Sequence, residues 1–241
     1  MDPESLKEVG DFLLTFIGFP LGTLSFFWVI LIAIGLWEKH YVRPYSDALA
    51  QSEVEVRPRL MKLCRAAREL NFVRGTFHKQ RSYAVTGVFA LSDDREILFE
   101  AGEGKVATKK VCQVWLFSRL VNGEILMTTD EFDEGDISGI VKVKYVVNVP
   151  LAKLVDAHRK RMEKSSATVQ PFPEEEAFAA FVGIKQDMVD AMIARGWARW
   201  LDESERDAWK YTVTGTFRMS LNLFKGFLSS LPQFWRVMAP R

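Results

Sequence analysis

The stretch VCQVWLFSRLVNGEILMTT, residues 111–129, decides the fold class of this chain. Two runs rich in β-branched, aromatic and aliphatic residues flank Asn122-Gly123, a dipeptide typical of tight β-hairpin turns because both residues tolerate positive φ. Similar runs occupy residues 82–92, 95–102 and 139–150, and clusters of Asp, Glu and Gly separate them. The sequence therefore predicts an antiparallel β-meander of about five strands.

Segments with helical periodicity flank this meander on both sides. Residues 58–72 carry Leu60, Leu63 and Ala67 at helical spacing, and residues 150–166 carry Leu151 and Leu154 in the same way. Lys142 and Lys144 alternate with apolar residues, as on a sheet with one face in water. Helices must then cover the other face, so we expect an α+β domain over residues 58–164.

Residues 165–216 predict a helical and hairpin subdomain. A linker leads into two short helices, broken near Gly183 and ending at Gly196, and two strand-like pieces follow at 197–201 and 209–217. This order of elements resembles a winged helix, without a diagnostic motif. Residues 173–216 hold nine acidic and five basic side chains. The excess of negative charge repels phosphates. We therefore expect no nucleic-acid binding, and any winged helix here would contact protein.

Residues 12–37 contain no charged side chain. As a helix the segment would be about 39 Å long, enough to cross a hydrocarbon core of about 30 Å. The preceding residues 1–11 carry four acidic side chains and one lysine, whereas a cleaved signal peptide begins with positive charge. We therefore predict a retained transmembrane helix.

Basic residues predict the orientation of this helix. Only Lys7 precedes it, whereas Lys39, Arg43, Arg57 and Arg59 follow it. The positive-inside rule then places residues 1–11 outside and the rest in the cytoplasm, with 38–57 as a polar connector. The predicted location is a cell inner membrane, crossed once. A domain on the opposite side of the membrane is the alternative.

Small residues recur along one face of the predicted membrane helix. Such residues let a second helix approach closely in lipid, so this face is a candidate helix–helix interface. The alternative is a plain anchor that Pro20 bends. The candidate interface residues are Thr15, Gly18, Gly22, Ser25 and Ala33.

Residues 217–241 predict an amphipathic helix with basic side chains and no acid. One face is aromatic and aliphatic and the opposite face is basic and polar, a pattern typical of helices that lie in a membrane interface. The alternative is a helix that packs on its own domain or on a partner. The candidate membrane-surface residues are Phe217, Arg218, Leu221, Phe224, Lys225, Leu228, Trp235 and Arg236.

Motifs for catalysis or metal binding are missing from the sequence. His40, His78 and His158 lie at no metal-ligand spacing, and we expect each of them to be solvated or to cap a helix. Cys64 and Cys112 are far apart in the sequence and form no metal-binding pattern, so we expect two small buried thiols in a reducing compartment. We expect no cofactor, no metal and no enzyme activity.

Together these features predict a single-pass membrane-anchored accessory or scaffold subunit. Its expected partners are membrane lipids and other membrane-complex proteins, or a second copy bound through the membrane helix. One alternative is a membrane-tethered enzyme whose site is built from residues distant in sequence. A second alternative is a membrane-tethered winged-helix regulator.

Overall fold

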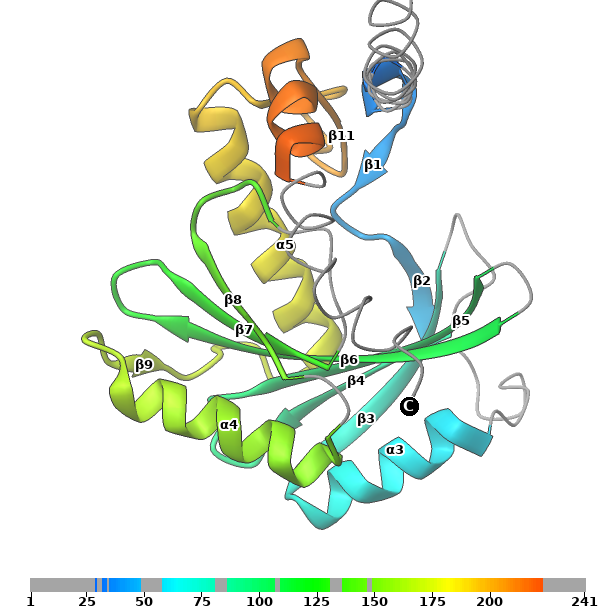
Figure 1. The fold of residues 1–241 in the computed structure, drawn as a ribbon, viewed down its shortest axis with the longest axis vertical. Coiled ribbons are helices and arrows are strands. Elements are labelled where there is room, and N and C mark those ends of the chain that lie inside the picture. Colours follow the sequence, from blue (N-terminus) through cyan, green and yellow to red (C-terminus); the bar gives the residue numbers. More distant parts are fainter. Residues whose placement is uncertain are drawn as a thin grey trace, which may run out of the picture.

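The computed structural model describes residues 29, 32–33, 35–48, 58–80, 86–106, 109–130, 136–146 and 149–222. The fold is α+β, built on a mixed sheet with helices on both faces (Figure 1). Seven strands of the described residues follow one another across this main sheet in the order β2-β3-β4-β5-β6-β7-β8, and β9 pairs with β6. Their bounds are Tyr45–Ala48, Phe72–Gln80, Thr86–Ser92, Leu98–Val106, Lys109–Leu120, Ile125–Thr129, Val141–Tyr145 and, for β9, Val169–Gln170.

The predicted hairpin at Asn122-Gly123 is confirmed. Strands β6 and β7 are antiparallel, with Arg119 opposite Ile125. Gly123 has a φ of 81°, and its N–H donates to the Leu120 carbonyl at 2.9 Å. The Asn122 side-chain oxygen accepts a hydrogen bond from the Glu124 N–H at 3.1 Å, which further stabilises the turn.

The last strand of the predicted meander runs in the unexpected direction. Strand β8 is parallel to β7, with Ile125 opposite Val141. A tight turn cannot join parallel strands, so the chain must return along the sheet before β8 begins. Residues 136–140 are the described residues directly before β8. Ile137 and Ser138 are buried there, and the Ile140 carbonyl accepts a hydrogen bond from the Ile125 N–H at 2.8 Å.

Strands β1 (His40–Tyr41), β2 and β3 were not expected from the sequence. The first two lie in residues that we assigned to a polar connector. Strand β3 includes the polar residues His78 and Lys79, and its register shifts between Val73 and Thr76. Charged side chains and this irregularity hide the period of two that marks a strand.

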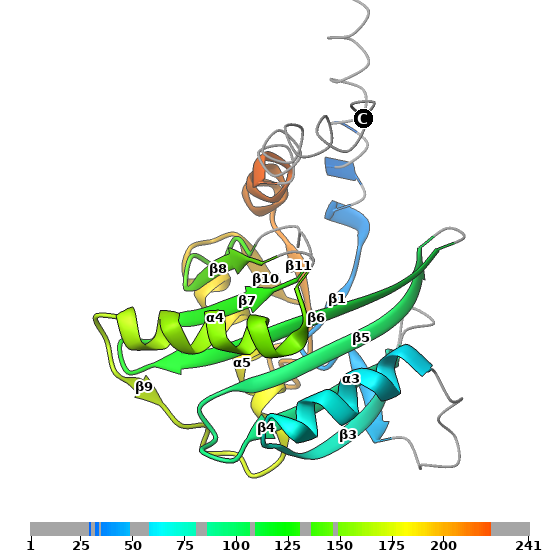
Figure 2. The same cartoon turned by 60° about the horizontal axis from the view of Figure 1, so that its bottom comes forward.

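Helices cover both faces of the main sheet rather than one. Helices α3 (Pro58–Glu69) and α4 (Leu151–Lys164) occupy one face, and α5 (Ala177–Ala194) occupies the other (Figure 2). Adjacent strand residues such as Leu98 and Phe99 therefore enter different cores. Strands β4 and β7 are buried along their whole length, whereas Lys142 and Lys144 of β8 are exposed as expected. We call β2–β9 with these three helices the sheet body.

The predicted break near Gly183 is wrong, because α5 runs through it as one helix. The Arg119 side chain of β6 lies against Gly183 instead. A Cβ there would lie 2.6 Å from Arg119 Nη2, and this guanidinium pairs with Asp187 Oδ2 at 3.0 Å. The resemblance to a winged helix is not found in the fold either. A winged helix packs its helices together, whereas α4 and α5 lie on opposite faces of the main sheet.

A second, smaller sheet lies at one end of the molecule. Strands β10 (Ala198–Trp200) and β11 (Ala208–Tyr211) form the predicted hairpin, and β1 pairs with β11. The second piece ends earlier than expected, because residues 213–222 are helical. A third core, which contains Val42, Trp209 and Met192, joins this small sheet to the carboxyl-terminal half of α5.

Most of the predicted membrane helix, 12–37, lies outside the described residues, as do residues 1–11. Among the residues that the structure does describe, no helix is both long and apolar enough to cross a membrane. Residues 29, 32–33 and 35–37 are helical. We call these the N-terminal helical segment, and residues 213–222 the C-terminal helical segment.

Candidate functional site

The two helical segments meet beside the small sheet, and we call this region the junction (Figure 1). Gly35 is buried there. A Cβ at Gly35 would lie 2.8 Å from Met219 Cε and 2.8 Å from Thr216 Cγ2. The backbone of the N-terminal segment therefore touches the side chains of the C-terminal segment, and a Cβ at position 35 would force Thr216 and Met219 to shift. Small residues permit the same close approach between helices in lipid.

Thr212 attaches the start of the C-terminal segment to the small sheet. Its Oγ1 accepts the Gly215 N–H at 3.1 Å, as a helix N-cap does. The same hydroxyl donates to the Gly196 carbonyl at 2.7 Å, and the Thr212 N–H donates to the Trp197 carbonyl at 3.0 Å. A Cβ at Gly215 would overlap that Trp197 carbonyl. The helix start is therefore held in place by the Thr212 hydroxyl and by close backbone contact with Trp197.

Two buried hydroxyls line the C-terminal segment. The Thr216 hydroxyl donates to the Thr212 carbonyl at 3.0 Å, and the Ser220 hydroxyl donates to the Thr216 carbonyl at 2.9 Å. Because each hydroxyl is satisfied within its own helix, neither needs a partner across the contact. The Asn222 amide donates to the Asp136 carbonyl at 3.4 Å, which ties the segment to the sheet body.

Cations lie over aromatic rings around the junction. The Arg218 guanidinium lies 4.2 Å from the centroid of the Trp197 ring, and the Arg195 guanidinium lies 5.5 Å from the same centroid. Lys39 Nζ lies 5.0 Å from the Tyr41 ring. Each arrangement keeps the cation exposed while its stem and the ring cover apolar surface.

The junction also exposes large apolar side chains. Trp37 is 87% exposed, Val213 is 68% exposed and Phe217 is 49% exposed. In the N-terminal segment, Val29, Ala33 and Leu36 are exposed as well. At helical spacing these three residues form one face, and Gly35 lies away from it. The face that contacts the chain's own helix and the exposed face are therefore different.

The structure places some of the predicted interface residues and not others. Ala33 is exposed on the N-terminal segment; Phe217 and Arg218 are exposed, and Leu221 is half-buried. Sequence reasoning missed Gly35 and the Thr212–Gly215 contact, although the motif Thr-Val-Thr-Gly contains a capping threonine. The remaining candidates lie outside the described residues: Thr15, Gly18, Gly22, Ser25, Phe224, Lys225, Leu228, Trp235 and Arg236.

His40 connects the N-terminal segment to the small sheet through its ring. It stacks on Trp209 with centroids 4.6 Å apart and meets the edge of Tyr211 at 5.1 Å. Burial lowers the pKa of His40, and the charge of Glu38 opposes this shift. The imidazole is therefore neutral at neutral pH and acts as a packing group, contrary to the solvated histidine that we expected.

The other two histidines are buried, which corrects the prediction that they are solvated or cap helices. His78 stacks on Phe178 with centroids 4.0 Å apart. His158 lies between α4 and the sheet, 3.0 Å from Ser118 Oγ and 2.8 Å from Thr128 Oγ1. Burial, followed by the charges of Arg161 and Arg159, lowers the pKa of His158 to about 3. This serine and histidine are sealed from solvent, so the pair supports the packing of α4 and cannot reach a substrate.

The two thiols are half-buried and unbonded to each other. Burial raises the pKa of Cys64, and burial together with Glu103 and Asp130 raises the pKa of Cys112 to about 12. Both are protonated at neutral pH and poor nucleophiles. Within the described ranges no group of three or more His, Cys, Asp or Glu side chains is arranged to hold a metal ion.

Comparisons with protein families, with curated proteins and with solved structures found no match to this chain.

Proposed function

We propose that this chain is a single-pass membrane-anchored accessory or scaffold subunit that holds a partner protein at the membrane face. The contact of Gly35 with Thr216 and Met219 carries the proposal, because it holds the C-terminal helical segment against the end of the predicted anchor, and Asn222 ties that segment to the sheet body. A rigid attachment of this kind suits a protein that positions a partner. A flexible linker would suit a merely tethered domain.

The surroundings of the junction support a membrane-proximal position. Trp37, Phe217 and Val213 expose apolar surface, and Arg218 and Lys39 place positive charge beside it. Aromatic rings anchor at lipid headgroups, and cations are attracted to anionic lipid. We propose that the body lies on the cytoplasmic side of an inner membrane, with the junction facing the lipid.

The exposed face of the N-terminal segment is the proposed site for a partner helix. Val29, Ala33 and Leu36 continue the series Gly18, Gly22 and Ser25 in helical steps of four, four and three residues. Because Gly35 makes the contact within the chain, this second face is available to another membrane helix. The partner is a membrane-complex protein or a second copy.

Crosslinking mass spectrometry in native membranes tests this proposal. We expect crosslinks from the N-terminal segment to one partner and a complex that survives extraction in mild detergent. Ala33→Leu should weaken that complex without changing the fold, because Ala33 is exposed. The matched variant Gly35→Leu should loosen the sheet body from the anchor while the partner stays bound. A strictly monomeric protein that crosslinks to nothing would contradict the proposal.

Reporter fusions at the two ends test the orientation separately. The N-terminal fusion should be active outside the cytoplasm and the C-terminal fusion inside it. A C-terminal fusion active outside would contradict the proposed placement of the junction on anionic lipid.

A further inference from the structure

The small sheet, in which β11 lies between β1 and β10, has one apolar face and one basic face. Successive residues of a strand point to opposite faces. Ala198 and Trp209 belong to the third core, and Trp200 packs against it, so these residues mark the apolar face. Arg199 and Lys210 alternate with them and therefore lie on the outer face. Arg199 is exposed there and Lys210 is half-buried.

Three basic residues lie in one row across this outer face. Arg199 is directly opposite Lys210 in the register of β10 and β11. Continuing the antiparallel register of β1 and β11 by one residue brings Lys39 opposite Lys210 from the other side. Tyr41 is opposite Ala208 on the same face, and the Lys39 Nζ lies 5.0 Å from the centroid of its ring. We call Lys39, Lys210 and Arg199 the basic row.

The basic row places like charges side by side. Directly opposite residues of antiparallel strands have Cβ atoms about 5 Å apart, and like charges there destabilise a sheet. None of the ion pairs recorded among the described residues involves the row. The neighbouring register positions carry no acid either; they are Tyr41, Trp197, Leu201, Ala208 and Thr212. An anion from outside the sheet would therefore compensate the charge of the row.

The acidic residues of the hairpin lie at its other end. Asp202, Glu203 and Glu205 belong to the turn between β10 and β11, where the Asp202 carboxylate accepts the Ser204 N–H at 2.8 Å. Strand β11 runs from this turn toward the C-terminal helical segment, and β1 runs away from the N-terminal helical segment (Figure 1). The basic row therefore lies toward the two helical segments, and the acidic turn lies away from them.

The basic row is also close to the end of the predicted membrane helix. Lys39 follows Trp37, the last residue of the uncharged segment, by two residues, which is at most about 7 Å of extended chain. Neighbouring strands are about 4.8 Å apart, so Lys210 and Arg199 follow about 5 Å and about 10 Å from Lys39. Attraction between charges extends over about 8 Å at physiological salt. Headgroups around the exposed Trp37 would therefore attract the row.

We propose that the basic row binds the phosphate groups of anionic phospholipids in the membrane that holds residues 12–37. Lysine and arginine donate charge-assisted hydrogen bonds to phosphate oxygens, and basic residues beside a membrane helix are attracted to anionic lipid. This inference rests on the proposed membrane anchor and deepens it, because it sets the outer face of the small sheet against the membrane. A lipid surface is favoured over an acidic protein because the row continues directly from the anchor.

Lysine acylation in bilayer nanodiscs tests the proposal. The full-length chain is incorporated into discs of phosphatidylcholine, with or without an equal amount of phosphatidylglycerol, and acylated with an N-hydroxysuccinimide ester of acetic acid. Only an uncharged amine reacts, so an ammonium group held against a phosphate reacts slowly. Phosphatidylglycerol should slow the acylation of Lys39 and Lys210, read by peptide mass spectrometry, at least about five-fold. Lys160 of α4, whose side chain is 66% exposed, should be unchanged.

Variants of Arg199 leave both lysine reporters in place. Arg199→Gln should reduce the protection of Lys210 by phosphatidylglycerol to less than half. Arg199→Glu should abolish it, because the new carboxylate pairs with Lys210 and repels phosphate. The urea midpoint of Arg199→Glu should not fall, since opposite charges across two strands stabilise a sheet. Lipid binding and sheet stability thus respond differently to one substitution.

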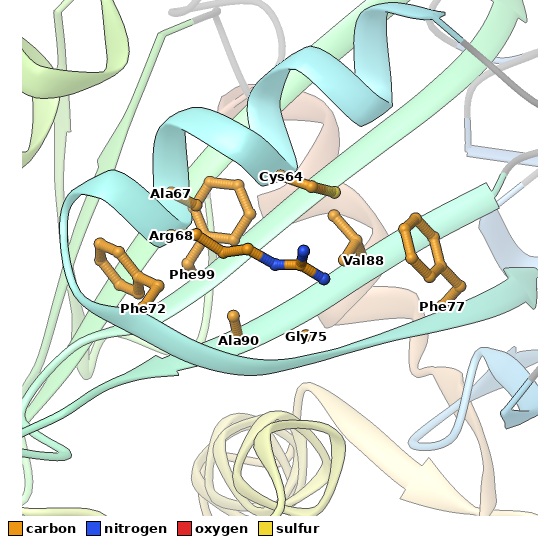
Figure 3. Close-up of a pocket in the computed structure, with 9 residues that line it drawn as sticks. All are labelled: Cys64, Ala67, Arg68, Phe72, Gly75, Phe77, Val88, Ala90 and Phe99. Carbon is orange, nitrogen blue, oxygen red and sulfur yellow. The ribbon is translucent and has the colours of Figure 1, made fainter. Parts of the chain in front are cut away.

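Arg68→Gln is the matched control, because Arg68 is an exposed arginine of α3, on the face of the main sheet opposite α5. Figure 3 shows its guanidinium over a hollow between α3 and the strands. This hollow has room for only about one water molecule and accepts no lipid. Arg68→Gln should therefore retain full protection of Lys39 and Lys210.

Equal acylation of Lys210 in the two lipids would overturn the proposal, even with Lys39 protected, because only the end of the anchor would then meet lipid. Full protection in Arg199→Glu would overturn it as well. Inorganic phosphate or poly-L-glutamate that protects Lys210 in phosphatidylcholine discs as well as phosphatidylglycerol does would assign the row to a soluble anion or an acidic protein instead. A chain that enters no disc would contradict the membrane anchor and this inference together, whereas the other failures leave the anchor standing.

Discussion

Lowering the pH from 7 to 5 should destabilise the sheet body through His158. The hydroxyl of Ser118 donates to the Glu96 carbonyl at 2.6 Å, so it must accept the proton of His158 Nε2. Thr128 Oγ1 accepts from Arg161 at 2.7 Å and donates to His158 Nδ1. A second proton on the imidazole would therefore face a donor, at a fully buried position beside an arginine.

The size of the effect follows from the difference in pKa between the folded and unfolded chain. The pKa of histidine is about 6.5 in the unfolded chain and is lowered to about 3 at His158 in the fold. A lowered histidine pKa stabilises the fold above pH 6.5, and this stabilisation is lost as the pH falls toward 3. At pH 5 the unfolded imidazole is charged while the folded one is neutral. The loss from pH 7 to pH 5 is about 2 kcal/mol.

Urea unfolding of the full-length chain in a non-ionic detergent measures this loss. The control is His158→Gln, whose amide keeps one donor and one acceptor but does not titrate. The variant should be less stable than the native chain at pH 7, yet lose about 2 kcal/mol less on acidification. All other titrating groups are common to both proteins. An equal loss of stability in both would refute the reasoning.

Three further substitutions test individual contacts. Gly215→Ala should displace the C-terminal helical segment, because its Cβ would overlap the Trp197 carbonyl, and limited proteolysis should cut near residue 212. Tyr45→Phe should cost about 1.5–3 kcal/mol in urea unfolding, because the Tyr45 hydroxyl donates to the buried Glu100 carboxylate at 3.1 Å. Gly123→Ala should cost about 1 kcal/mol, since φ is 81° and no atom lies within 4 Å of a Cβ there; a larger cost would mean that the turn makes contacts beyond its own backbone.

Local signals in the sequence predicted the elements that depend on neighbouring residues. The turn at Asn122-Gly123 and the strands on both sides of it follow from residues within a few positions of one another. The spacing of Leu60, Leu63 and Ala67 likewise predicted α3, since a helix repeats every 3.6 residues. Of the candidate site, Ala33, Phe217 and Arg218 could be placed on faces of helices by the same periodicity.

Contacts between distant residues decided what the sequence did not reveal. Gly183 looked like a helix break, but it makes room for Arg119 of β6, and only the packed fold brings those two residues together. His158 looked solvated among charged neighbours, yet Ser118 and Thr128 provide its hydrogen bonds from two strands.

By itself, the sequence determined the α+β class, the positions of most strands and helices, and an apolar segment without charge. Only the tertiary structure decided that β8 runs parallel to β7, that helices cover both faces, and that Gly35 meets Thr216. The physical reason is that periodicity and turn chemistry act over a few residues. Burial, strand direction and close backbone approach depend on which segments, distant in the sequence, pack against one another and exclude water between them.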